Sequence, residues 1–134
     1  MGLLSETYNG EHQADLKRTG CVEFDLVAVN LYPFANTVAQ EGATLEDART
    51  NIDIGGPCML RASAKNFLRV ASVCDPADYE GIVGELKKSD GALSLASRLA
   101  LAKKSFAHTA AYDAAISQYL VDQRDFGVYQ LGGR

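Results

Sequence analysis

No run of apolar residues in the sequence approaches the roughly 20 that a helix needs to cross a bilayer. The N-terminus also lacks the basic stretch and apolar segment that mark a secretory signal. The three cysteines, Cys21, Cys58 and Cys74, are odd in number and lack the spacing of a disulfide framework or a zinc site. We therefore expect a cytoplasmic protein without a structural metal, neither secreted nor membrane-bound.

An excess of positive charge is missing as well, because 13 Lys and Arg stand against 17 Asp and Glu, a net charge of −4 at pH 7. Without a global positive field, neither nucleic acid nor a membrane surface is an expected partner. The glycine spacing fits neither the dinucleotide-binding fingerprint nor the P-loop, and no nucleophile elbow supports a catalytic triad. An anionic ligand must therefore be held by a local site.

What is present is the composition of one globular domain. The chain has 134 residues, of which 47% are hydrophobic and 22% charged, and it contains no repeat and no Gly, Pro or Ser-rich linker. A chain of this length buries roughly two thirds of the surface that its unfolded form exposes. We expect a single domain over residues 1–134 that needs no disulfide or metal to fold.

Two apolar runs predict strands, over residues 23–31 and 70–74. The first is continuous enough to be covered on both faces, as in a parallel sheet. Caps and helical periodicity predict helices over residues 11–17, 44–51, 57–67, 76–88 and 94–120. This order predicts an α/β fold, a small parallel sheet with helices on its faces. Because two strands are few for a sheet, further strands lie in weakly patterned segments or part of the sheet is absent.

Polar side chains follow the first predicted strand, where α/β proteins bind ligands. Asn30 and Tyr32 come directly after its apolar run. They either contact a ligand, or Asn30 caps the strand end and Tyr32 packs as a half-buried aromatic ring. The spacing alone leaves both interpretations open.

A second candidate is the turn formed by Asp53, Ile54, Gly55 and Gly56 ahead of a helix that we expect to begin at Pro57. Glycine amides at a helix N-terminus can bind an anion or a polarised carbonyl, with the Asp53 carboxylate beside them. The alternative is an Asx turn that merely joins two helices.

On the helix that follows, Arg61 and Lys65 lie four residues apart and therefore on one face, with Asn66 next in the chain. Both basic side chains either point into solvent or face whatever binds at the turn. A lysine drawn into a cleft can donate a proton or stabilise charge. His108 and Asp113 are five residues apart on the long helix, and we expect structural or partner-contact roles for them.

Five segments together carry a resemblance: residues 25–34 (DLVAVNLYPF), 51–57 (NIDIGGP), 60–66 (LRASAKN), 74–79 (CDPADY) and 106–113 (FAHTAAYD). In this order they resemble the inosine monophosphate (IMP) cyclohydrolase domain of the bifunctional purine-biosynthesis enzyme that also carries the AICAR transformylase. The resemblance implies a methylglyoxal-synthase-like parallel sheet with flanking helices. It also implies ring closure of 5-formamidoimidazole-4-carboxamide ribonucleotide (FAICAR) to IMP and water, with no metal or organic cofactor.

By the same resemblance, three residues are expected to be catalytic. Lys65 corresponds to a lysine that donates a proton and stabilises charge on the formyl oxygen. Asp53 corresponds to a carboxylate that orients or deprotonates the carboxamide, and Tyr32 to a hydrogen-bonding group near the reacting formyl.

The expected substrate-binding residues are Asn30, Ile54, Gly55 and Asn66. Asn30 corresponds to a hydrogen-bonding group near the base, and the backbone of Ile54 and Gly55 to the lining of the same pocket. Asn66 follows Lys65 in the matched motif, whereas Arg61 is expected to be structural support.

The sequence also departs from the family pattern. It has neither the Ser/Thr-Gly-Gly-Thr phosphate loop nor the Arg-x-Lys-Thr-Leu-His-Pro segment, and Phe67 replaces a common histidine. We therefore expect a domain that is incomplete at its N-terminus, with FAICAR and IMP as ligands and a second copy or a complementary N-terminal segment as protein partner. The alternatives are a non-catalytic purine-nucleotide-binding or regulatory module of the same fold, and an inert fragment that self-associates.

Overall fold

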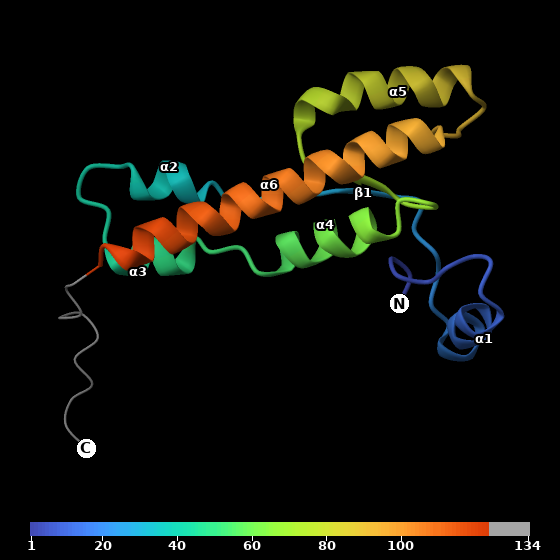
Figure 1. Ribbon diagram of the computed structural model, residues 1–134, viewed down its shortest axis with the longest axis horizontal. Helices are drawn as coiled ribbons and strands as arrows, with labels where there is room; N and C mark the ends of the chain where they lie inside the picture. Colours follow the sequence, from blue (N-terminus) through green and yellow to red (C-terminus); the bar gives the residue numbers. More distant parts are fainter. Residues whose placement is uncertain (124–134) are drawn as a thin grey trace. The chain divides into compact units, whose positions relative to one another are not determined.

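The computed structural model describes residues 1–123 (Figure 1). The chain divides into two compact units. The first unit contains residues 1–31 and 53–110, and the second contains residues 32–52 and those from 111 onward. One helix, α6 (Leu95–Val121), runs without interruption from the first unit into the second. None of the helices within residues 1–123 is long and apolar enough to cross a membrane.

The first unit contains a parallel pair of short strands, β1 (Leu26–Ala28) and β2 (Ala71–Val73). The Val29 amide continues the ladder by donating to the Val73 carbonyl at 2.9 Å. The two strands therefore end at the same edge of the sheet. This pairing confirms the predicted α/β class with a small parallel sheet.

The prediction of a first strand covered on both faces is wrong. β1 spans three residues, and Leu26 and Ala28 are exposed, whereas all three residues of β2 are buried. The apolar core of the unit is built on Ala71 and Val73, which cluster with Leu101 of α6. A strand is buried on both faces only where both faces are covered by other elements, and in this unit that strand is β2 rather than β1.

Four more helical segments complete the first unit. They are α1 (Gly10–Thr19), α4 (Gly55–Lys65), the 3₁₀ turn η1 (Pro76–Asp78) and α5 (Tyr79–Lys88). α4 begins two residues before the predicted start at Pro57. The earlier start is tolerated because the first amides of a helix have no acceptor within it, so a proline in the first turn breaks no hydrogen bond.

Three buried hydroxyls join α4, β2 and α6. Ser63 donates to the Ser72 hydroxyl at 2.8 Å, and the Ser72 and Ser105 hydroxyls are 2.9 Å apart. Each of these side chains is at most 1% exposed. Small side chains let the three elements pack closely while every hydroxyl keeps a partner, which fixes α4 against the sheet.

The second unit contains α2 (Phe34–Val38), α3 (Leu45–Thr50) and the end of α6. Phe34 is 1% exposed and makes edge contacts with the rings of Tyr112 and Tyr119. At the start of α3, Thr44 and Asp47 form the predicted capping box. The sequence patterns did not predict α2, a helix of five residues.

Candidate functional site

The edge of the sheet where both strands end carries the first candidate side chains. Asn30 follows β1 and is exposed, and its Nδ2 donates to the hydroxyl oxygen of Tyr79 at 3.3 Å. Tyr79 is the first residue of α5, shortly after β2. The sequence therefore predicted one member of this pair, and the structure adds the other.

The turn before α4 lies close to this strand end. The Asp53 carboxylate accepts a hydrogen bond from the Gly56 amide at 2.8 Å. The Gly56 Cα also lies against the Leu31 side chain, since a Cβ built on it would come within 2.5 Å of Leu31 Cδ2. Leu31 is the neighbour of Asn30, so this packing brings Asn30 and Asp53 into one region of the first unit.

The Asp53–Gly56 hydrogen bond spans three residues, one more than an Asx turn, and is of the kind by which a side chain caps a helix start. It holds the half-buried carboxylate against the first turn of α4, while Ile54 is 72% exposed and Gly55 is exposed. The amides of a helix N-terminus carry partial positive charge. The turn therefore presents a fixed carboxylate and a helix N-terminus at the same surface, which suits a ligand with both amide hydrogens and a carbonyl oxygen.

Tyr32 belongs to the second unit. Its side chain is 56% exposed, and its carbonyl accepts the Phe34 amide at 2.8 Å just before α2.

Lys65 and Asn66 lie at the opposite end of α4. With a rise of 1.5 Å per residue, the ten steps from Gly55 to Lys65 separate their backbones by roughly 15 Å. The structure therefore brings Asn30, Asp53, Ile54 and Gly55 together but does not bring Lys65 to them.

Asn66 is used by the protein itself. It is 8% exposed, and its Nδ2 donates to the carbonyl oxygens of Leu3 and Ser5, both at 2.9 Å. Asn66 thus ties the first residues of the chain to the end of α4.

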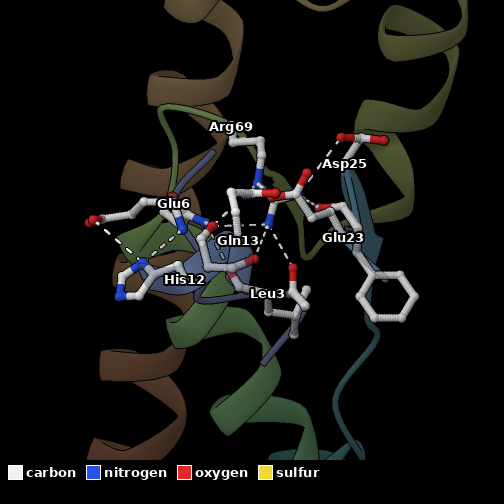
Figure 2. Close-up of polar contacts among 11 residues, drawn as sticks. Leu3, Glu6, His12, Gln13, Glu23, Asp25 and Arg69 are labelled. Atoms are coloured by element: carbon white, nitrogen blue, oxygen red, sulfur yellow. Dashed lines mark hydrogen bonds and ion pairs between the residues drawn. The ribbon is translucent and has the colours of Figure 1, made fainter. Parts of the chain in front are cut away.

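The exposed Lys65 lines a cavity of about 220 Å³ at this end of the helix, together with Leu4, Glu6, His12 and Asn66. The Glu6 amide donates to His12 Nδ1 at 3.2 Å, and the Glu6 carboxylate lies 3.8 Å from the same atom (Figure 2). Lys65 therefore lies beside the N-terminal segment, and not beside the turn before α4.

Arg69 is the centre of the polar contacts that hold this segment (Figure 2). Its side chain is 12% exposed and donates to the carbonyl oxygens of Gly2 at 2.6 Å and Phe24 at 2.7 Å. The carboxylates of Glu23 and Asp25 lie 3.8 and 3.7 Å away. Arg69 was not among the residues predicted from the sequence. The one signal for it in the sequence is its position as a charged residue just before a predicted buried strand.

A second ionic cluster follows β2. Lys104 Nζ lies 2.7 Å from an Asp75 oxygen and within 2.9 Å of both Asp78 oxygens. The hydrogen bonds to Asp75 and Asp78 raise the pKa of Lys104, and the Lys104 bond is the main cause that lowers the pKa of Asp75. Burial raises the pKa of the neighbouring Cys74 thiol. The ion pairs of Lys104 with Asp75 and Asp78 join the segment after β2 to α6, so this cluster is suited to a structural role.

The Arg61 guanidinium lies over the Phe106 ring at 5.6 Å from the centroid, a cation–π contact between α4 and α6. Among residues 1–123, no group of three His, Cys, Asp or Glu is placed to hold a metal ion.

Comparisons with known proteins identify the family of the chain. Residues 63–131 match the family model described as the AICARFT/IMPCHase bienzyme. The chain is 51% identical over 124 residues to the bifunctional purine biosynthesis protein PurH of Neisseria gonorrhoeae (strain NCCP11945), covering 92% of the chain and 24% of that protein. It is 50% identical over 122 residues to PurH of Limosilactobacillus reuteri (strain DSM 20016), covering 91% of the chain and 24% of the relative.

Among solved structures, the crystal structure of ForH matches with a TM-score of 0.81 and 32% identity, covering 92% of this chain and 64% of that one. The chain spans about a quarter of the length of the two PurH relatives.

Proposed function

The chain belongs to the AICARFT/IMPCHase bienzyme family, and from this premise we propose that it carries the cyclohydrolase chemistry, the ring closure of FAICAR to IMP and water. The observation that supports this most directly is the grouping of Asn30, Asp53 and the N-terminus of α4 at the edge where β1 and β2 end. These residues come from two of the segments that carry the resemblance.

The reaction is intramolecular. The carboxamide nitrogen attacks the formyl carbon, forming a carbon–nitrogen bond and losing one proton. The formamido nitrogen loses a second proton as its bond to the formyl carbon becomes double, and the formyl oxygen leaves with both protons as water. Holding the two groups in contact supplies much of the rate enhancement. The remaining requirements are an acceptor for the proton of the carboxamide nitrogen and a donor for the developing oxyanion.

The turn before α4 offers both. The Asp53 carboxylate, fixed by the Gly56 amide, orients the carboxamide and accepts its proton. The Ile54–Gly55 backbone lines the pocket, where the helix N-terminus stabilises negative charge on the formyl oxygen. Asn30 hydrogen-bonds the base. A hydrogen bond from Tyr32 near the formyl group stays a prediction from the resemblance.

The role of Lys65 as proton donor is proposed from the resemblance alone. Because α4 separates its backbone from Gly55 by roughly 15 Å, Lys65 and Asp53 do not act on the same atoms within one chain. A Lys65→Met variant with unchanged turnover would place the reaction entirely at the Asp53 end of the helix.

The test is the conversion of FAICAR to IMP, with product formation measured by chromatography. It is run with the chain alone and with the chain mixed with the N-terminal residues of the N. gonorrhoeae relative. Removing a general base costs on the order of a hundredfold or more in turnover, so we expect that loss in Asp53→Asn. Asp15→Asn is the matched control, because Asp15 is an exposed carboxylate that pairs with Arg18 on α1. The proposal is contradicted if no IMP forms with the chain alone or in the mixture, or if the two variants turn over at the same rate.

A second candidate is a purine-nucleotide-binding module without turnover. The separation of Lys65 from Asp53 favours it, since the two residues implied to be catalytic are not assembled at one place. Calorimetry with IMP distinguishes the two functions: binding without turnover supports the module, and turnover excludes it.

A further inference from the structure

Tyr79 is a side chain that the structure adds directly to one of the predicted binding residues, Asn30. Its hydroxyl accepts the hydrogen bond from Asn30 Nδ2, across 49 positions of sequence. We propose that Tyr79 is a positioning residue, which holds the Asn30 amide so that its Oδ1 accepts an N–H from the carboxamide of the ligand. This inference rests on the proposed function of the same site.

An exposed asparagine has several rotamers, and its amide presents a donor at one end and an acceptor at the other. A ligand that binds Asn30 must select one orientation, and the entropy lost in doing so weakens binding. With one Nδ2 hydrogen bonded to Tyr79, the amide is held in one orientation, and a ligand meets its Oδ1 and the second Nδ2 hydrogen. The hydroxyl therefore prepares Asn30 for a ligand that presents an N–H to Oδ1, as a primary carboxamide does.

The hydroxyl can act as a fixed support only if Tyr79 is itself held in place. Tyr79 directly follows η1, and the acids at either end of η1 are Asp75, its N-cap, and Asp78, its last residue. Lys104 on α6 binds both carboxylates at 2.7 to 2.9 Å. The segment carrying Tyr79 is thereby fastened to the longest helix of the protein at the edge where Asn30 lies.

Kinetics provide the first test, with Tyr79→Phe, which keeps the ring, Asn30→Ala and the double variant. We expect Tyr79→Phe to lower kcat/KM about fivefold, mainly by raising KM, as fits the loss of one ordinary hydrogen bond. In the Asn30→Ala background the same change should have no further effect. Tyr8→Phe, the same change on an exposed tyrosine, should leave kcat/KM unchanged. An equal loss with and without Asn30 would overturn the proposal.

The Asn30 side-chain ¹⁵N–¹H₂ signals, assigned by their absence in Asn30→Ala, give a readout that does not depend on activity. We expect these signals to shift in Tyr79→Phe and to stay in place in Tyr8→Phe. Signals unmoved by Tyr79→Phe overturn the positioning role, whatever the kinetics show. If the wild-type chain neither binds IMP nor converts FAICAR, the proposed function fails, and the signals still decide whether Tyr79 fixes the amide.

Discussion

The two adjacent glycines at the start of α4 should respond in opposite ways to the same substitution. A Cβ on Gly56 would lie 2.6 Å from the Asp53 Oδ2 and 2.5 Å from Leu31 Cδ2, both far inside normal contact. A Cβ on Gly55 would meet no described atom within 4 Å. Gly56→Ala must therefore displace the Asp53 carboxylate and the Leu31 side chain, whereas Gly55→Ala displaces nothing.

The sizes follow from this geometry. Alanine in a helix is favoured over glycine by up to about 1 kcal/mol, less in the first turn, so Gly55→Ala should be neutral or slightly stabilising. The two clashing atoms end side chains, which can move aside at a lower cost than backbone. Displacing the carboxylate breaks the 2.8 Å hydrogen bond from Gly56, a loss of about 1 kcal/mol. We expect Gly56→Ala to lower the free energy of unfolding by about 1 kcal/mol relative to Gly55→Ala.

Urea unfolding followed by far-UV circular dichroism measures both variants against the parent chain. Turnover of FAICAR should also fall in Gly56→Ala by more than the lost stability explains, because the Asp53 carboxylate has moved. If Gly56→Ala is as stable as Gly55→Ala, the close packing of Leu31 and Asp53 on α4 is wrong, and with it the argument that Asn30 and Asp53 share one region.

Three further outcomes can be checked by unfolding experiments. Arg69→Met should lower the free energy of unfolding by about 2–4 kcal/mol, because a largely buried guanidinium loses its bonds to backbone carbonyls, while exposed Arg18→Met should cost under about 1 kcal/mol; equal losses would refute the anchoring role. Lys104 lowers the pKa of Asp75 in the folded chain, so the stability that Asp75 contributes is complete above its unfolded pKa of about 4 and is lost as pH falls through the lower folded pKa. Unfolding from pH 5 to pH 2 should therefore depend less steeply on pH in Asp75→Asn, and parallel curves would count against the ion pair. Phe34→Ala should cost about 3–5 kcal/mol in the second unit, read as lost hydrogen-exchange protection in α3, and unchanged protection would contradict the packing of Phe34 there.

Features determined by near neighbours in sequence were predictable. The capping box of Thr44 and Asp47 and the turn of Asp53 and Gly56 each depend on residues three positions apart, so the chain carries both partners within one short motif. The position of β2 was likewise predictable from its apolar run, although burial on both faces was predicted for the first strand instead.

Features that depend on distant partners were not. Arg69 binds the carbonyl of Gly2, and a backbone carbonyl leaves no signature in the sequence. The bond between Asn30 and Tyr79 requires the parallel pairing of β1 and β2 to place both at one edge. The position of Asn66 beside Lys65 in a motif suggested a ligand contact, but its amide faces the N-terminal segment.

The most direct test of the central claim is a titration of the ¹⁵N-labelled chain with IMP, following backbone amide signals. The two ends of α4 are the competing sites, roughly 15 Å apart along the helix. We expect the largest shifts at Asn30, Ile54 and Gly55, with the amides around the Lys65 cavity unmoved. Shifts confined to Lys65 and His12, or no shifts at either end, would contradict a nucleotide site at the N-terminus of α4.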